Sequence, residues 1–113
     1  MDAMTMKRME ARARIMKALA HPTRLFLMDR IAQAERPVAE LATLAGADIS
    51  TVSKHLSLLK AVGLLNVRKA GTTVYYRLAC PCAMDFFTCL EGVLQANVQS
   101  QLEVMGKENR RGR

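Results

Sequence analysis

Residues 48–59 read DISTVSKHLSLL, and their apolar positions follow the period of an amphipathic helix. One buried face is predicted, because apolar residues recur at steps of three and four: Ile49, Val52, Leu56 and Leu59. Asp48 stands where an N-cap carboxylate would accept a hydrogen bond from the backbone amide of Ser50 or Thr51. The opposite face carries hydroxyls and one lysine: Ser50, Thr51, Ser53, Lys54 and Ser57.

A short helix is predicted directly before this one. Pro37 suits the first helical position, where a missing N–H needs no partner, and Gly46 suits the left-handed residue that ends a helix. The apolar face between them comprises Val38, Leu41, Ala42 and Ala45. Residues 46–48 alone join the two helices, and so tight a connection containing glycine is typical of a helix-turn-helix.

Two further helices are predicted on the N-terminal side. Methionine and alanine recur at helical spacing from Met6 to Ala20. This helix ends near His21, because Pro22 disfavours helical geometry in the residue before it. The next helix begins at about Thr23 and buries three apolar side chains: Leu25, Met28 and Ala32.

Beyond Gly63, which ends the helix of residues 48–59, the apolar period changes to two. The alternation occupies two runs: Leu65 and Val67, then Val74, Tyr76 and Leu78. Gly71-Thr72 lies between them, and a glycine in the first central position suits a two-residue type II′ hairpin. A last amphipathic helix follows and runs to about Met105. The predicted fold class is mainly α with a small β-hairpin, a winged helix-turn-helix, with residues 1–106 as a single domain and 107–113 as a basic flexible tail.

The charge distribution indicates a polyanionic partner. The chain has 113 residues, too few for a large multidomain enzyme, and 17 Lys and Arg against 10 Asp and Glu give a net charge of +7. No acidic residue occurs from Ile49 to Ala79, so a basic field over this part points to nucleic acid. No apolar run approaches the roughly 20 residues that span a bilayer. We therefore expect a cytoplasmic protein with no membrane partner.

Double-stranded DNA is the predicted partner, because a helix fits the major groove and a hairpin can lie along the adjacent groove. Small hydroxyls at the start of the helix allow close approach to base edges, and lysine or arginine on the hairpin would neutralise phosphates. The candidate DNA-binding residues are Ser50, Thr51, Ser53, Lys54, Ser57, Lys60, Arg68, Lys69, Thr72 and Tyr75.

Three motifs occur in the order and spacing of a known family. They are LAHPTRL (19–25), STVSKHL (50–56) followed by Leu59 and Gly63-Leu64, and VYYRL (74–78). Together they resemble the ArsR/SmtB family of bacterial repressors over about residues 15 to 80. The resemblance implies a homodimer formed through the first and last helices, which leaves a DNA operator, expected to be an imperfect palindrome, when a metal, metalloid or other inducer binds.

The chain departs from that family's metal sites at two places. Many arsenic sensors of the family carry Cys-Val-Cys at the start of the third helix, whereas residues 36–41 read RPVAEL and hold no thiol. The zinc sensors use Asp and His pairs on the last helix, and here Val98 and Gln101 stand where further ligands are expected after Asp85. Neither site is therefore expected in this chain.

The remaining candidate metal ligands are Cys80, Cys82 and Cys89, the three cysteines of the chain. If the last helix began at Pro81, Cys82 and Cys89 would lie about 10 Å apart along its axis. We therefore favour Asp85 as N-cap, with residues 80–84 as a loop that folds back. Three soft sulfurs suit As(III) or Sb(III) as inducer, whereas Cd or Zn would need Asp85 as a fourth ligand.

Several alternatives stay open from the sequence. A redox sensor would need only a pairing of Cys80 or Cys82 with Cys89. A constitutive architectural DNA-binding protein would leave the cysteines inert, and a small thiol oxidoreductase would lack the base that such chemistry needs. No catalytic constellation is visible, so an enzyme is not expected, and DNA binding itself should require no cofactor. His21 and His55 are single histidines for which packing or capping roles are expected.

Overall fold

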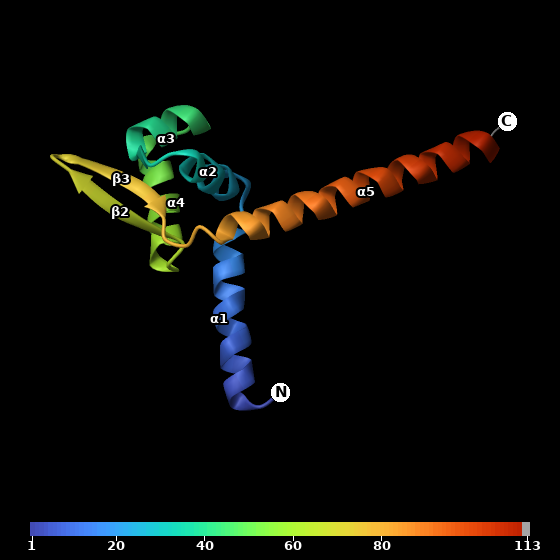
Figure 1. The fold of residues 1–113 in the computed structure, drawn as a ribbon, viewed down its shortest axis with the longest axis horizontal. Helices are drawn as coiled ribbons and strands as arrows, with labels where there is room; N and C mark the ends of the chain where they lie inside the picture. Colours follow the sequence, from blue (N-terminus) through green and yellow to red (C-terminus); the bar gives the residue numbers. More distant parts are fainter. Residues whose placement is uncertain (112–113) are drawn as a thin grey trace. The chain divides into compact units, whose positions relative to one another are not determined.

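The computed structural model describes residues 1–111, and the side chains of residues 1–106. It divides into two compact units, Met1–Pro81 and Cys82–Arg113. The first unit contains, in chain order, α1 (Ala3–Leu19), α2 (Pro22–Gln33), β1 (Arg36–Pro37), α3 (Val38–Ala45), α4 (Ile49–Ala61), β2 (Leu65–Ala70) and β3 (Thr73–Leu78) (Figure 1). The second unit consists of α5 (Ala83–Arg111). The predicted winged helix-turn-helix fold is thereby confirmed.

The helix boundaries follow from local chemistry. The Asp2 carboxylate caps α1 by accepting from the Thr5 amide at 2.7 Å. Hydrogen bonding by the side chain and then by the backbone of Thr5 lowers the pKa of Asp2. His21 caps α2 in the same way, since its Nδ1 accepts from the Thr23 amide at 3.1 Å. Gly46 ends α3 with φ 65°, the left-handed conformation predicted for it.

The core lies where α2, α3 and α4 pack against each other and against β2. Its fully buried side chains are Leu27, Met28, Leu41, Val52, Leu56, Leu59 and Leu65. The apolar face predicted for α4 is thus confirmed at three of its four positions. It is wrong at Ile49, which is 55% exposed because it occupies the first turn of α4, before the helix reaches the core. Asp48 is the N-cap as predicted, but its side chain makes no capping hydrogen bond.

The sheet has three strands in the order β1-β3-β2, and the sequence predicted only two of them. In β1, Arg36 pairs with Tyr76 and Pro37 with Tyr75 of β3. Pro37 is therefore an edge-strand residue and the N-cap of α3, and its predicted place as the first helical residue is wrong. Proline fits this position because an edge strand leaves one side of its backbone unpaired.

The hairpin between β2 and β3 has the predicted turn. Ala70 pairs with Thr73, so Gly71 and Thr72 form a two-residue connection. Gly71 has φ 64°, whereas Thr72, like every other non-glycine residue that the structure describes, has a negative φ. A positive φ at the first central residue alone is the pattern of a type II′ turn.

Helix α5 begins at Ala83, three residues earlier than an N-cap at Asp85 would allow. The Asp85 amide already donates to the Cys82 carbonyl at 3.1 Å, so Asp85 lies inside the first turn and the predicted N-cap is wrong. The bounds of α5 extend past the predicted domain limit at residue 106, to Arg111. The side chains of the predicted flexible tail, 107–113, lie outside the described ones. No described helix is long and apolar enough to span a membrane.

The core assignment predicts a contrast between two residues of α4. Leu56→Ala should reduce the free energy of unfolding by about 2–5 kcal/mol, because it removes a buried side chain and leaves a cavity. Ile49→Ala should change it by less than about 0.5 kcal/mol, because this side chain is largely in solvent. Urea denaturation of both variants measures the difference, and a large loss for Ile49→Ala would contradict the observed exposure.

Candidate nucleic-acid interface

The outward face of α4 carries the side chains predicted to meet DNA. Val52, Leu56 and Leu59 are fully buried, and this fixes the rotation of the helix about its axis. Of the predicted residues, Ser53 is half-buried, and the exposed ones are Ser50, Thr51, Lys54, Ser57 and Lys60. The structure therefore places five of the six predicted α4 contacts on one accessible helix, and the sixth at its margin.

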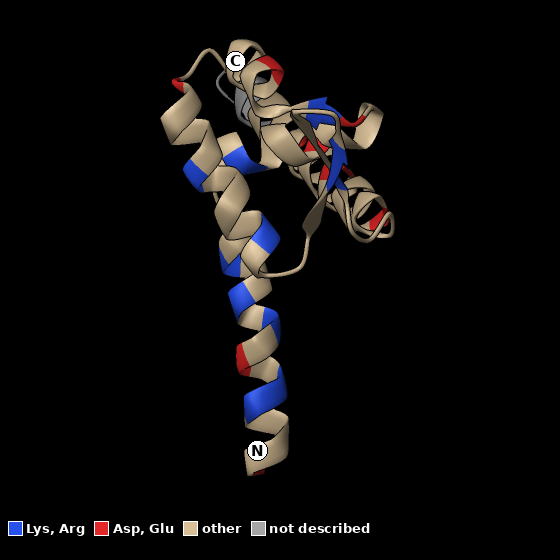
Figure 2. Cartoon of the chain, turned by 90° about the vertical axis from the view of Figure 1, so that its left-hand side faces the viewer, with Lys and Arg blue, Asp and Glu red and all other residues tan. Residues whose placement is uncertain are grey.

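The lysines of this surface form no ion pair with the side chains that the structure describes. Among residues 1–106, no ion pair engages Lys54, Lys60 or Lys69. The two ion pairs found among residues 1–106 involve arginines, Arg36 and Arg68. Figure 2 shows lysine and arginine positions along α1 and on the hairpin. Unpaired cations next to exposed hydroxyls form a surface suited to a phosphate backbone.

The wing residue Arg68 is held rather than free. Its Nε donates to the Glu35 carboxylate at 2.7 Å, and its guanidinium lies 4.8 Å from the ring centroid of Tyr75. Tyr75 is the residue directly opposite Arg68 in the β2–β3 ladder. Two predicted DNA-contact residues, Arg68 and Tyr75, are thus brought together. The orientation of the Arg68 guanidinium is set by Glu35, a residue that was not predicted from the sequence. The remaining wing candidates, Lys69 and Thr72, are exposed near the hairpin tip.

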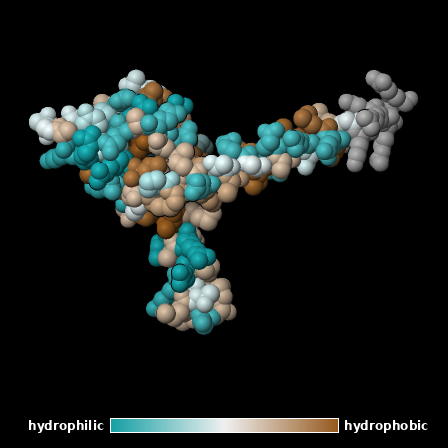
Figure 3. All heavy atoms as spheres, in the orientation of Figure 1, coloured by the Kyte–Doolittle hydropathy of each residue, from teal (hydrophilic) through white to brown (hydrophobic). Residues whose placement is uncertain are grey.

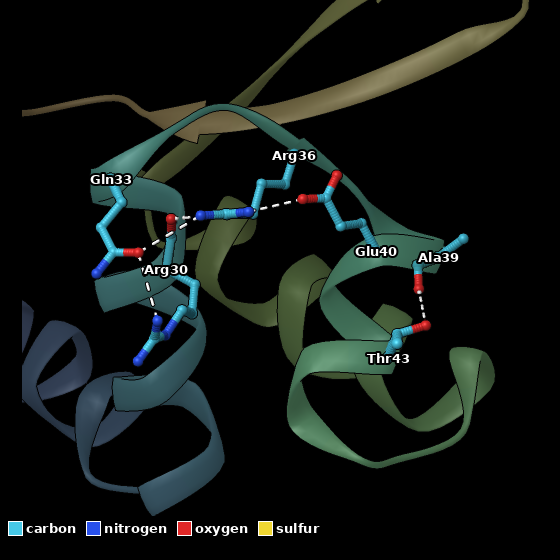
Figure 4. A network of polar contacts seen from close by, with 6 residues as sticks. All are labelled: Arg30, Gln33, Arg36, Ala39, Glu40 and Thr43. Carbon is cyan, nitrogen blue, oxygen red and sulfur yellow. Dashed lines mark hydrogen bonds and ion pairs between the residues drawn. The ribbon is translucent and has the colours of Figure 1, made fainter.

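A second arginine joins the helix-turn-helix to the sheet. Arg36 donates from Nε to the Arg30 carbonyl at 3.0 Å and from Nη1 to the Glu40 carboxylate at 2.6 Å (Figure 4). It therefore connects the end of α2, strand β1 and the start of α3. Since β1 pairs with β3, this network also fixes the base of the wing relative to the helices. The contacts join residues that no local sequence pattern relates, apart from the four-residue spacing of Arg36 and Glu40.

Helix α4, the second helix of the helix-turn-helix and therefore its recognition helix, is linked to α2 by a hydrogen bond between Arg24 and His55. The Nε of Arg24 donates to the Nδ1 of His55 at 3.1 Å, and its Nη1 donates to the Ala18 carbonyl at 3.0 Å. The rings of His21 and His55 lie with their centroids 4.6 Å apart. The expected capping and packing roles of the two histidines are thereby confirmed. Burial, the neighbouring His21 and the Arg24 cation, in that order, lower the pKa of His55 below its ordinary value of 6.5.

The predicted metal ligands are not assembled into a metal site. No group of three or more His, Cys, Asp or Glu side chains in the described part of the chain could hold a metal ion. Cys80 and Cys82 are disulfide-bonded, and Cys89 is a free, exposed thiol. The predicted pairing of Cys80 or Cys82 with Cys89 is therefore not the one observed. With α5 starting at Ala83, the seven positions between Cys82 and Cys89 correspond to about 10 Å along the helix.

The chain resembles a known domain family and several known transcriptional regulators. The helix-turn-helix domain family matches residues 10–68, just over half of the chain. The HTH-type transcriptional regulator Rv0324 of Mycobacterium tuberculosis is 46% identical over 67 residues, which are 59% of this chain and 30% of that protein. A transcriptional repressor SmtB homolog of Synechocystis is 34% identical over 86 residues, which are 76% of this chain and 65% of that protein. The chain thus spans less than two thirds of either relative.

A solved structure shows the same architecture over a larger share. It is the NMR structure of a homodimeric winged helix-turn-helix DNA-binding domain, fragment 1–100 of Mb0332 from Mycobacterium bovis, described as a possible ArsR-family transcriptional regulator. It matches with a TM-score of 0.79 and 33% identity, and covers 88% of this chain and 93% of that one.

The exposed face of α4, the basic wing and these likenesses define a winged helix-turn-helix domain of the transcriptional-regulator type. The chain belongs to the ArsR/SmtB family, as the three sequence motifs predicted.

Lys54 provides a test of the interface. Lys54→Ala should weaken binding to duplex DNA and reduce the slope of log affinity against log salt by about one, because one phosphate contact is lost. Lys7→Ala, which makes the same charge change on α1, is the matched control and should leave the slope unchanged. Fluorescence anisotropy at several salt concentrations measures both. Equal slopes for Lys54→Ala and the unmodified chain would remove Lys54 from the contact surface.

The lowered pKa of His55, caused first by burial and then by His21 and Arg24, predicts a pH-dependent stability. A lowered pKa in the folded state means that the unfolded chain binds more protons, so stability is full above about pH 6.5 and decreases as the pH falls toward the folded-state pKa. His55→Asn retains an acceptor for Arg24 but does not titrate. Thermal unfolding between pH 7.5 and 5 should therefore show a smaller decrease for His55→Asn. Parallel curves for the two proteins would contradict the role of His55.

Proposed function

We propose that this protein is a cytoplasmic, homodimeric repressor that binds a double-stranded DNA operator with the symmetry of an imperfect palindrome. The observation that carries the proposal is the outward face of α4, where exposed hydroxyls and unpaired lysines share one helix over an acid-free stretch of chain. In a helix-turn-helix, such a helix enters the major groove and the wing contacts the adjacent backbone.

The homodimer is supported by apolar side chains that the single chain leaves in solvent. On α1 the exposed apolar residues are Met4, Met6, Ile15 and Met16. On α5 they are Phe86, Leu90, Val93, Leu94, Val98, Leu102, Val104 and Met105, and apolar atoms reach the surface along the face of α5 drawn in Figure 3. Exposed apolar faces of this extent mark interaction surfaces. A two-fold dimer would present two α4 helices, and this requires an operator with two related half-sites.

The inducer is proposed to act through Cys80, Cys82 and Cys89. Three thiols within ten residues are soft ligands that suit As(III) or Sb(III), and Cd or Zn becomes a candidate if Asp85 adds an oxygen. In the described conformation these residues do not form a metal site, and the seven-residue separation of Cys82 and Cys89 corresponds to about 10 Å of helical rise. A metalloid would need the disulfide reduced and the first turns of α5 rearranged, or a thiol from a second protomer.

A redox-sensing repressor is the second candidate. The observation that favours it is the oxidised state of Cys80 and Cys82, which lie directly before α5. Reduction and oxidation there would alter the start of a helix proposed for the dimer interface. The spacing of the two recognition helices, and with it the operator affinity, would then depend on the thiol state. A constitutive architectural protein would respond to neither metalloid nor oxidant.

One titration distinguishes these candidates. The reduced protein is bound to a fluorescent duplex that it has selected from a random-sequence library, and As(III), Cd(II), Zn(II) or an oxidant is added. Metalloid sensing predicts at least tenfold weaker binding with As(III), abolished by Cys89→Ser. Redox sensing predicts release by the oxidant, abolished by Cys80→Ser and retained by Cys89→Ser. Binding that no addition disturbs would contradict cysteine-based sensing and leave DNA binding intact.

A further inference from the structure

The first residue of the recognition helix is a large apolar side chain that the core does not use. Ile49 is 55% exposed, although it belongs by spacing to the apolar face of α4. The buried part of that face begins one turn later, at Val52, which is 0% exposed. Burial in the core therefore does not account for isoleucine at this position.

Neither cavity near the helices offers Ile49 a place. A cavity of about 250 Å³ is lined by Pro22, Thr23, Phe26, Leu44 and Ala45. A second cavity of about 440 Å³, near the other end of α4, is lined by Arg14, Lys17, Ala18, Ala20, Arg24, Leu58 and Val62. The exposed leucine of α4, Leu58, thus belongs to the second cavity, whereas Ile49 lines neither. It is an exposed apolar side chain at the start of α4, preceded by the exposed Ala47 and Asp48 and followed by the exposed Ser50 and Thr51.

The major groove presents one apolar group on its base edges, the C5-methyl group of thymine. In a helix-turn-helix the N-terminal residues of the recognition helix are the ones that contact base edges. Ile49 occupies this end of α4 and is followed by the exposed Ser50 and Thr51, whose hydroxyls can bond to any base edge. The hydroxyls therefore do not explain discrimination between bases, whereas a branched apolar side chain discriminates by contact with a methyl group.

We propose that Ile49 is a specificity-determining residue that packs against the C5-methyl group of a thymine in each operator half-site. The inference rests on the proposed binding of α4 in the major groove. It goes beyond that function by assigning a T·A pair to one residue of this chain. Neighbouring Lys54 would supply phosphate affinity without base preference, so the two residues have separable effects.

Replacement of thymine by uracil tests this, because uracil pairs as thymine does and lacks only the methyl group. The reduced protein first selects a duplex from a random-sequence library, and each thymine is then replaced singly. At one thymine per half-site, uracil should weaken binding about fourfold, the effect of one buried methyl group. Ile49→Ala should bind the thymine and uracil duplexes equally at that position, and Ile49→Val should retain part of the difference.

Leu44→Ala is the matched control, since Leu44 is an exposed apolar residue of α3 and should leave the uracil effect unchanged. The proposal is overturned if no uracil substitution weakens binding, or if Ile49→Ala keeps the same uracil effect as the unmodified chain. It is also overturned if Ile49→Ala loses affinity equally for all duplexes together with thermal stability, or if Ile49 instead proves necessary for dimer formation. Failure to select any duplex would refute the proposed operator binding itself, and is thus distinguishable from a failure at Ile49.

Discussion

The burial of one face of α4 is the constraint on which the interface depends. Val52, Leu56 and Leu59 pack into the core with α2, α3 and β2, and this fixes the rotation of the helix about its own axis. A rotation that exposed them would forfeit about 1.5–3 kcal/mol for each side chain. The hydroxyls and lysines between them are therefore held outward by the core. One face of this thirteen-residue helix thus packs in the core, and the other carries the side chains that we propose contact DNA.

Polar contacts between distant segments fix the remaining geometry. Arg36 joins the end of α2 to the start of α3 through Glu40, and its strand pairs with β3, so these contacts link the base of the wing to the helix-turn-helix. Glu35 holds Arg68 against Tyr75. A DNA phosphate approaching the wing would compete with this carboxylate for Arg68, whereas Lys54 and Lys69 have no such partner within the described residues. The wing therefore presents one arginine that an ion pair holds, Arg68, and one lysine, Lys69, that no described residue neutralises.

The sequence allowed the helices, the hairpin and most of the core to be predicted, because each has a local signal: apolar period, proline and glycine positions, and turn residues. It did not predict β1, since a two-residue strand exists only through its pairing with β3. It also placed Ile49 in the core, because periodicity gives the face of a residue and not how far along the helix the core extends. Glu35 and Arg68, which form an ion pair, lie 33 residues apart in sequence, and only the fold brings them together.

We infer that two α4 helices occupy successive major grooves of one DNA duplex. Dimethyl sulfate footprinting on the selected duplex tests it most directly, because this reagent methylates guanine N7 in the major groove and adenine N3 in the minor groove. We expect protection of guanine N7 in two clusters separated by one helical turn, about 10 base pairs, or a multiple of it. Saturated binding that leaves every guanine N7 reactive would contradict the account and place the protein on the minor groove or the phosphates alone.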